Sequence, residues 1–221
     1  VCDGMGGHAA GEVASALAID ALETFFRSYH ADPRQPWPHP VDTQHSLGAN
    51  LLRVGIKVAN DRIRAAAKQD RAKNRMGTTI VALAVGDAQL TVAHAGDSRC
   101  YRLRGDEIHR LTRDHSIVEE MIAARPEMTE AEVATFAHRN VVTRSLGSKE
   151  QVEPTVLVEP LVPGDLFLVC SDGLWGSVPD DKIKSIVRST NDIEGACQLL
   201  IDAANEAGGP DNITSVLVRV G

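Results

Sequence analysis

The sequence has few aromatic residues, more acidic than basic side chains, and no long apolar run. Aromatic side chains make up 4% of the 221 residues, so we expect a core built from aliphatic side chains. A formal net charge of −7 argues against non-specific nucleic-acid binding, which needs a basic surface. No apolar stretch reaches the roughly 20 residues of a membrane-spanning helix, and no signal peptide is recognisable. These absences predict a cytoplasmic protein that binds neither nucleic acid nor membrane.

Cysteine is also scarce, and several catalytic motifs are missing. The four cysteines, Cys2, Cys100, Cys170 and Cys197, form no C-x-x-C pair, which disfavours a zinc site and indicates free thiols in a reducing compartment. No serine lies in the G-x-S-x-G turn of an α/β-hydrolase. Neither a P-loop nor a dinucleotide-binding fingerprint follows a predicted strand. Serine-nucleophile hydrolysis and nucleotide binding therefore both fit the sequence poorly.

The sequence does contain four aspartates that each stand beside a glycine or two residues from one, close to a predicted strand. Residues 166–170 form a buried apolar run that leads to Asp172, and Asp3 follows a similar short run. Asp97 interrupts an apolar stretch, and Asp211 lies in a turn before the closing apolar run. Carboxylates that gather without basic partners repel one another, and a hard divalent cation relieves that repulsion. The pattern predicts a metal site built from strand ends.

Hydrophobic periodicity predicts groups of helices and strands. Tight turns between successive strands, such as the turn at residues 86–87, indicate an antiparallel meander with long helices before and after it. We expect helices over residues 9–29, 46–72, 117–124, 179–187 and 192–207, and strands over residues 80–85, 90–95, 100–103, 166–170 and 213–220. Because no linker or repeat divides the chain, residues 1–221 should form a single α+β domain in which helices pack on sheets.

Residues 116–140 are more polar than their surroundings and are expected to leave the layered core. A short helix ends before Pro126, and Thr129 with Glu132 has the spacing of a capping box that starts another helix. Helical excursions of this kind can act as lids over a site. We therefore expect a flap at about residues 116–140.

Several short motifs follow one another along almost the whole chain. They are Asp3-Gly4-Met5-Gly6-Gly7-His8, Gly77-Thr78-Thr79, Ala95-Gly96-Asp97-Ser98-Arg99-Cys100-Tyr101, Leu111-Thr112-Arg113-Asp114-His115-Ser116, Thr143-Arg144-Ser145-Leu146-Gly147, Cys170-Ser171-Asp172-Gly173-Leu174 and Gly209-Pro210-Asp211-Asn212. Each motif alone is a weak signal, but the ordered set is highly specific. In this order the motifs resemble those of the metal-dependent protein serine/threonine phosphatases of the type 2C (PPM) family, in its bacterial form.

The resemblance implies a fold and a set of metal ligands. The fold would be a four-layer αββα sandwich of two antiparallel β-sheets flanked by helices, with two Mn²⁺ or Mg²⁺ ions at one edge and a possible third ion. Carried over by position, Asp3 would bridge both ions, and the Gly4 carbonyl would bind the second. Asp172 and Asp211 would hold the first ion, and Asp97 with Asp172 would hold the third. The family's flap coincides with the predicted helical excursion.

The implied activity is hydrolysis of phosphoserine and phosphothreonine in proteins. A hydroxide bridging the two ions would attack phosphorus in line, and the ions would offset the charge of the transferring group. His8 is a candidate proton donor to the leaving alkoxide, although a histidine after a glycine-rich turn has an equally good structural explanation. The expected partners are phosphorylated proteins, including a Ser/Thr protein kinase.

The chain departs from the family pattern at its start. Family members carry, upstream of the position of Asp3, an arginine that grips the substrate phosphate and an acidic pair that helps to bind the second ion. The domain is therefore expected to be N-terminally incomplete. The alternative to an active phosphatase is a catalytically impaired binding or regulatory module with the same fold. A third hypothesis is hydrolysis of another phosphoester. Metal titration would separate the first two hypotheses, and a substrate panel would separate the first from the third.

Overall fold

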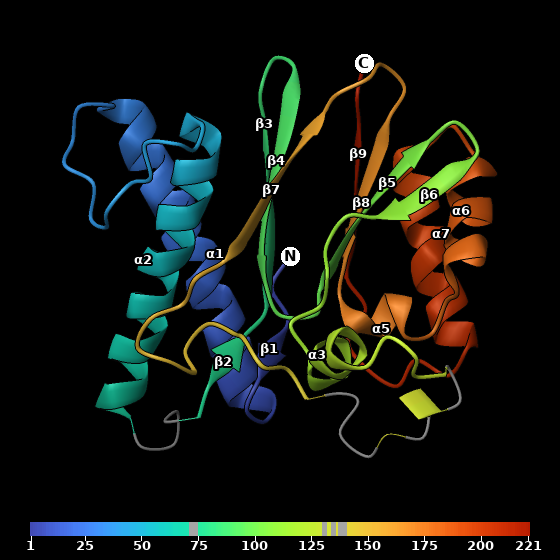
Figure 1. The fold of residues 1–221 in the computed structure, drawn as a ribbon, viewed down its shortest axis with the longest axis horizontal. Coiled ribbons are helices and arrows are strands. Elements are labelled where there is room, and N and C mark those ends of the chain that lie inside the picture. Colours follow the sequence, from blue (N-terminus) through green and yellow to red (C-terminus); the bar gives the residue numbers. More distant parts are fainter. Residues whose placement is uncertain (71–74, 130–131, 134–135, 137–140) are drawn as a thin grey trace.

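The computed structural model describes residues 1–221 apart from residues 71–74, 130–131, 134–135 and 137–140. Two helices, two sheets and two further helices lie in four successive layers (Figure 1), which confirms the predicted αββα sandwich. The first layer contains α1 (His8–Ala31) and α2 (Leu47–Gln69), which pack against each other. None of the described helices is both long and apolar enough to cross a bilayer.

The first sheet is antiparallel, with the strand order β3-β4-β7, and it adjoins the helical layer. Strands β3 (Ile80–Val85) and β4 (Gln89–Ala95) form the predicted hairpin, in which the Gly86 N–H donates to the Gln89 carbonyl at 2.8 Å. Strand β7 (Thr155–Pro160) pairs with the other edge of β4. The sequence analysis did not predict β7, because its pairing partner lies far away along the chain.

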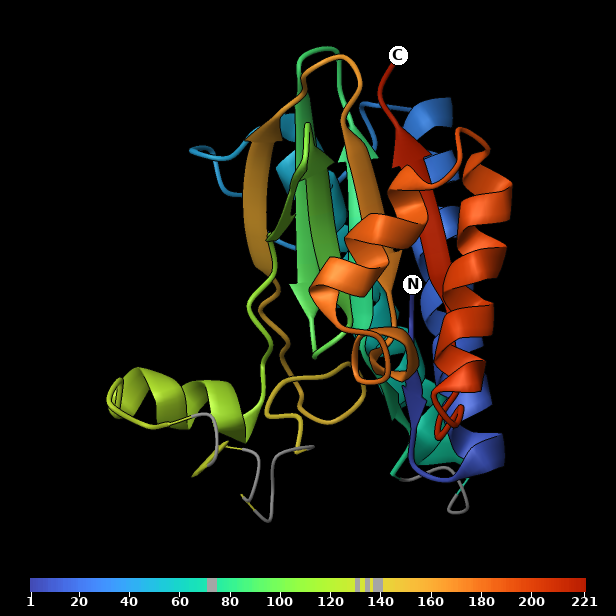
Figure 2. The ribbon, with the colours of Figure 1, turned by 90° about the vertical axis from the view of Figure 1, so that its right-hand side faces the viewer.

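The second sheet has four antiparallel strands in the order β6-β5-β8-β9. The strands are β5 (Arg99–Arg104), β6 (Glu107–Arg110), β8 (Leu166–Cys170) and β9 (Ser215–Arg219). Helices α6 (Asp180–Arg188) and α7 (Ile193–Glu206) cover the outer face of this sheet (Figures 1 and 2). All residues of β8 are buried, as expected for an inner strand between two layers.

The predicted antiparallel meander is wrong at residues 96–98, where the chain crosses from the first sheet to the second. The antiparallel pairs on either side of this crossover, β3 with β4 and β5 with β6, do form. Strand β5 follows β4 after residues 96–98, but it pairs with β6 and β8 in the second sheet. Gly96 has a φ of 118°, and a Cβ here would lie 2.6 Å from the Cβ of Thr79. Glycine therefore lets the backbone change direction while staying in contact with the start of the first sheet. Asp97 lies on this crossover.

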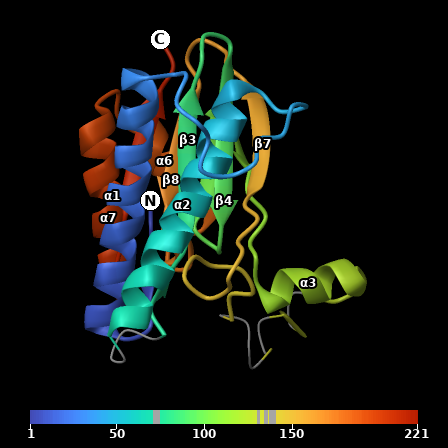
Figure 3. The same ribbon diagram turned by 90° about the vertical axis from the view of Figure 1, so that its left-hand side faces the viewer.

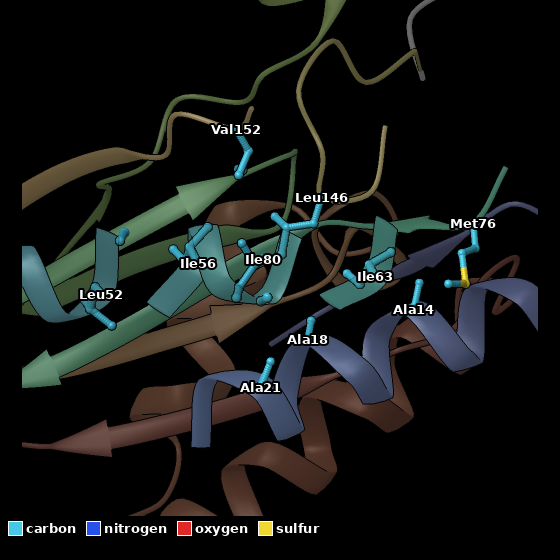
Figure 4. Packing of buried hydrophobic residues seen from close by; sticks show 13 residues of the cluster. Ala14, Ala18, Ala21, Leu52, Ile56, Ile63, Met76, Ile80, Leu146 and Val152 are labelled. Carbon is cyan, nitrogen blue, oxygen red and sulfur yellow. The ribbon is translucent and has the colours of Figure 1, made fainter. Parts of the chain in front are cut away.

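Three apolar layers hold the sandwich together. The outer layer joins α1 and α2 to the first sheet, and it places Ala14 and Ala18 of α1 in one cluster with Leu52 and Ile56 of α2 (Figure 4). A similar layer fastens α6 and α7 to the second sheet. The layer between the sheets consists of Val81, Leu90, Val92, Cys100, Phe167 and Val169. The core is thus mainly aliphatic, as the composition predicted.

The first residues of the chain run beside β3, but the predicted strand that leads into Asp3 is wrong in its bounds. The strand observed is β1 (Gly4–Met5), which pairs with β2 (Gly77–Thr78). Before it, Val1 and Val81 exchange two backbone hydrogen bonds of 2.9 Å. Asp3 is therefore held between these two sets of backbone contacts.

Strands β3 and β9 each form one edge of their sheet in the part of the chain that the structure describes. A groove of about 450 Å³ lies against these edges and is lined mainly by apolar side chains, including Val81, Val169, Val216 and Val218. None of the four aspartates lines it. This groove is therefore separate from the predicted metal site.

Helix α3 (Ile117–Ala124) lies outside the four layers, at one end of the sandwich (Figures 2 and 3). None of its residues is fully buried. Thr129 and Glu132 form the predicted capping box, in which the Thr129 N–H donates to Glu132 Oε2 at 2.8 Å and the Glu132 N–H donates to Thr129 Oγ1 at 3.3 Å. Part of the predicted flap, residues 130–131, 134–135 and 137–140, lies outside the described residues, and its role as a lid stays a prediction.

The substitution Gly11→Ala tests the close approach of β1 to α1. A Cβ on Gly11 would lie 2.7 Å from the carbonyl carbon and oxygen of Gly4. Because both contacts are with backbone, neither can be relieved by rotating a side chain. We expect Gly11→Ala to lower the free energy of unfolding by about 1–3 kcal/mol, the usual cost of overpacking. Equilibrium unfolding in urea measures this change.

The substitution Gly48→Ala in α2 is the matched control. Its Cβ would meet nothing closer than Thr91 Oγ1 at 3.4 Å, which is an ordinary contact. We expect Gly48→Ala to stabilise the protein by up to about 1 kcal/mol, because alanine is favoured over glycine in helices. Equal losses of stability in both variants would contradict a specific clash at Gly11.

Candidate metal centre

The four aspartates predicted to bind metal lie close together, because Asp3 interacts electrostatically with each of the other three. Asp97, Asp172 and Asp211 line a cavity of about 740 Å³. No three His, Cys, Asp or Glu side chains in the described ranges converge closely enough to enclose an ion by themselves. An ion here would therefore need backbone carbonyls and water as ligands beside the carboxylates.

The end of β8 brings Asp172 and Asp211 together. Asp172 follows β8 after one residue and begins the short helix α5 (Asp172–Trp175). The hydroxyl of Ser171 donates to the Asn212 carbonyl at 3.0 Å. It also accepts the backbone N–H of Thr214 at 3.0 Å. These bonds tie the turn that contains Asp211 to the end of β8.

Asp97 is held in place by Trp175. The Nε1–H of Trp175 donates to the Asp97 carbonyl at 2.9 Å, so α5 fixes the crossover between the sheets. The guanidinium of Arg99 lies 3.4 Å from the centre of the Trp175 ring, a cation–π contact. Arg99 also donates from Nε to Asp114 Oδ1 at 3.0 Å and from Nη2 to Oδ2 at 2.7 Å. Arg99, Trp175 and the Asp97 turn thus form one packed unit.

Three aspartates of the cluster have raised pKa values. Burial, together with the neighbouring carboxylate of Asp172, raises the pKa of Asp3 to about 7 from an ordinary value of 3.8. Burial and the charge of Asp172 raise the pKa of Asp97 to about 6, and burial raises the pKa of Asp172 itself. In the described ranges, ion pairs form at the buried aspartates Asp114 and Asp165, and none forms at these four, of which Asp211 is exposed and the others are half-buried. The cluster therefore concentrates negative charge that a bound cation would neutralise.

Asp172 gives the clearest indication that the cluster suits a cation. Its Oδ1 is buried and has no hydrogen-bond partner among the residues that the structure describes. A buried polar atom left without a partner costs about 1–3 kcal/mol. A hard divalent ion coordinates carboxylate oxygens and would supply the missing partner. Because Asp172 interacts electrostatically with Asp3, Asp97 and Asp211, the residues present fit the predicted centre.

Two other predicted site residues are described less fully. Gly4 lies in β1 directly after Asp3, and the role of its carbonyl as a metal ligand stays a prediction. His8 begins α1, but its side chain lies outside the part of the structure that is described. Its role in proton transfer therefore also stays a prediction.

Other motif residues near the cluster make structural contacts. Arg144 Nη1 donates to the Glu153 carbonyl at 3.0 Å and to Thr155 Oγ1 at 3.1 Å. His115 Nδ1 accepts the Gly96 N–H at 3.1 Å, which helps to hold the crossover. Burial lowers the pKa of His115 to about 3. His115 is therefore uncharged at neutral pH and is poorly suited to proton transfer.

Sequence reasoning placed Ser171 and Thr79 within motifs but assigned no role to them or to Trp175, although each supports an aspartate-bearing segment. Their hydrogen bonds join segments that are far apart along the chain, and no local spacing signals such bonds. Asn212 orients Asp211 locally, because its backbone N–H donates to Asp211 Oδ1 at 2.8 Å.

Residues 1–213 match the family model described as protein phosphatase 2C. The chain belongs to this family. Protein phosphatase PhpP of Streptococcus pneumoniae is 37% identical over 224 residues, which cover 100% of this chain and 84% of that protein. The crystal structure of the Mycobacterium tuberculosis serine/threonine phosphatase PstP/Ppp has a TM-score of 0.84 at 32% identity and covers 99% of this chain and 86% of its own. The catalytic domain of PstP in complex with two manganese ions has a TM-score of 0.79 at 33% identity, with coverage of 98% and 84%.

The family, the fold class and the enzyme class predicted from the ordered motifs are therefore confirmed for this protein phosphatase. The likeness extends over nearly the whole chain, as the spread of the motifs indicated. The role of each aspartate as a metal ligand stays a prediction.

The raised pKa of Asp3 predicts how the stability of the metal-free phosphatase depends on pH. Asp3 releases its proton at about pH 7 in the folded protein and at about 3.8 in the unfolded chain. The folded state binds more protons between these values, so this group makes the free energy of unfolding fall as the pH rises from about 4 to about 7. Asp3→Asn removes the group and should make the fall shallower. Urea unfolding at several pH values in the presence of a chelator measures both slopes.

The same urea unfolding measurements in saturating Mn²⁺ are the matched condition for those in chelator. A cation in the cluster would replace the proton, and its affinity increases as the carboxylates ionise, so stability should no longer fall over this pH range. Equal slopes for the wild type and Asp3→Asn in chelator would show that Asp3 does not hold a proton in the folded state.

Proposed function

We propose that this protein phosphatase hydrolyses phosphoserine and phosphothreonine in proteins at a centre of two divalent cations, with a possible third. Asp3 would bridge the two ions, Asp172 and Asp211 would bind the first, and the Gly4 carbonyl would bind the second. Asp97 with Asp172 would hold the third. The observation that carries the proposal is the acid cluster, in which the pKa of Asp3 is raised to about 7 beside a cavity of about 740 Å³.

Manganese is the cation that the relatives support best. The catalytic domain of PstP, which is 33% identical to this chain, was solved in complex with two manganese ions. Carboxylate and carbonyl oxygens suit both Mn²⁺ and Mg²⁺, so the ligand types in this chain are compatible with either ion. The proposed count of two ions follows that relative, and the possible third ion follows from the presence of Asp97 beside Asp172.

The chemistry that divalent ions supply at such a centre is activation of water at neutral pH and neutralisation of phosphoryl charge. The contribution of the chain is to hold the ligand-bearing segments at fixed separations. Ser171 ties the Asp211 turn to the end of β8, and Trp175 ties the Asp97 turn to α5. Preorganisation of this kind makes electrostatic catalysis effective, because little rearrangement is needed during the reaction. His8 is the proposed proton donor to the leaving group.

The lining of the cavity supports a protein substrate. Beside the aspartates it includes the apolar side chains of Val118 and Ile122 from α3, and Trp175 from α5. Residues that flank a phosphorylated position would pack against these side chains. Val118 and Ile122 belong to the proposed flap at about residues 116–140. The proposed partners are phosphorylated proteins, including a Ser/Thr protein kinase. All four cysteines are free thiols, which supports a reducing compartment, the cytoplasm, as the proposed location of this phosphatase.

One observation favours a second candidate function, that of a catalytically impaired binding or regulatory module. The arginines that line the cavity in the described ranges are Arg99 and Arg110, and both are ion-paired. Arg99 pairs with Asp114, and Arg110 pairs with Glu119. The described part of the cavity thus offers a phosphate no uncommitted guanidinium. A module of this kind would bind metal ions or phosphoproteins without hydrolysing the phosphoproteins.

Turnover of a phosphothreonine peptide and of a small aryl phosphate tests the proposed function. We expect hydrolysis with Mn²⁺ and none with chelator. Asp172→Asn should lower kcat/KM by at least about 100-fold, because loss of a metal ligand costs more than loss of its outer hydrogen-bond partners. Asp181→Asn makes the same chemical change at an aspartate of α6 whose side chain is 92% exposed, and it should retain turnover.

The other outcomes separate the hypotheses. A Mn²⁺-dependent rise in melting temperature without turnover would favour the binding module. Turnover of the aryl phosphate alone would indicate a different phosphoester substrate. Full Mn²⁺-dependent activity in Asp172→Asn would contradict the proposed ligand set.

A further inference from the structure

A single buried hydroxyl group joins the segment that carries Asp3 to the turn that carries Asp97. Thr79 Oγ1 accepts the Asp3 backbone N–H at 3.0 Å and lies 2.7 Å from Ser98 Oγ. A hydroxyl group has one hydrogen and two lone pairs, so both hydrogen bonds can form at once. Thr79 is 2% exposed and Ser98 is 1% exposed, so water does not compete for these bonds.

Close packing reinforces this link. Gly96 directly precedes Asp97, and a Cβ on Gly96 would lie 2.6 Å from the Cβ of Thr79. The crossover therefore cannot move toward Thr79 without a clash, and it cannot move away without breaking the bond to Ser98. The Thr79 side chain sets the separation between the Asp3 backbone and the Asp97 turn.

The Thr79 hydroxyl is distinct from the contacts that hold the Asp3 segment in the fold. The Asp3 carbonyl accepts the Thr79 N–H at 2.8 Å and the Thr78 hydroxyl at 2.9 Å. Neither of these bonds uses Thr79 Oγ1. Removing the hydroxyl would thus leave the Asp3 carbonyl anchored while uncoupling the two acid-bearing segments.

We propose that Thr79 is a positioning residue that fixes the separation of Asp3 and Asp97 and thereby sets the affinity of the centre for divalent cations. The inference rests on the proposed function, because it requires these two aspartates to bind ions. Ligands that repel one another stay at coordinating distances only when supporting residues lock their positions. Loss of such supporting hydrogen bonds typically costs 10–100-fold in metal affinity.

The test is direct binding of Mn²⁺ to chelator-stripped protein, with the free ion followed by electron paramagnetic resonance. Thr79→Val keeps the shape of the side chain but removes the hydroxyl, and its dissociation constant for Mn²⁺ should rise by about 10–100-fold. Thr79→Ser keeps the hydroxyl and should bind nearly as tightly as the wild type. Thr91→Val is the matched control, since Thr91 is also a buried threonine, in β4, and it should leave Mn²⁺ affinity unchanged.

Melting temperatures of the metal-free variants separate positioning from folding. We expect both Thr79→Val and Thr91→Val to stay folded, with Thr79→Val the less stable because the Thr79 hydroxyl makes two hydrogen bonds, and with only Thr79→Val losing Mn²⁺ affinity. Ser98→Ala removes the same contact from its other side, and it should weaken Mn²⁺ binding even if Thr79→Val fails to fold.

Unchanged Mn²⁺ affinity in the folded variant, Thr79→Val or Ser98→Ala, would overturn the inference. A Thr79→Ser variant as weak as Thr79→Val would also overturn it, because the methyl group and not the hydroxyl would then be responsible. A wild-type protein that binds no Mn²⁺ would overturn the proposed function and this inference together. Wild-type binding with unaffected variants would overturn the inference alone.

Discussion

Mutual repulsion among Asp3, Asp97, Asp172 and Asp211 is the constraint on which the rest of this structure depends. In the described ranges these carboxylates have no basic ion-pair partner, and the raised pKa values of Asp3 and Asp97 reflect both burial and neighbouring negative charge. Such groups would move apart if their backbones were free to do so. The protein therefore has to fix the segments that carry them before any cation binds, and its fold is arranged to do this.

The segments are fixed where two backbones approach too closely for any residue but glycine. A Cβ on Gly173 would lie 2.4 Å from the Asn212 carbonyl oxygen, and a Cβ on Gly96 would lie 2.6 Å from Thr79. Gly173 stands where the Asp172 and Asp211 segments meet, and Gly96 stands where the Asp97 turn meets Thr79, which contacts the Asp3 backbone. The close approach brings the hydroxyl of Ser171 to the Asn212 carbonyl and the hydroxyl of Thr79 to the Asp97 turn. The glycines thus permit the close approach of the two segments, and the hydroxyl groups stabilise it through hydrogen bonds.

Local structure could be predicted from the sequence because local signals determine it, as with the hairpin at residues 86–87 and the helices on either side of the sheets. The crossover at residues 96–98 could not be predicted, because Gly-Asp has the composition of a hairpin turn. Only the pairing of β5 with β8, far along the chain, assigns it to the second sheet. The aspartates were found because each stands within two residues of a glycine and near an apolar run. The supporting roles of Trp175 and Thr79 were not found, because their hydrogen bonds exist only once distant segments have packed.

The charges of the cavity also bear on how a phosphate would bind. Arg99 and Arg110 line the cavity, but they already pair with Asp114 and Glu119. Separating a partly buried pair would leave an uncompensated carboxylate, which is strongly destabilising. Attraction toward a phosphate would then come mainly from cations held by the aspartates, so that metal binding and substrate binding are linked. In that arrangement, groups that position the aspartates, such as the Thr79 hydroxyl, affect substrate affinity as well as chemistry.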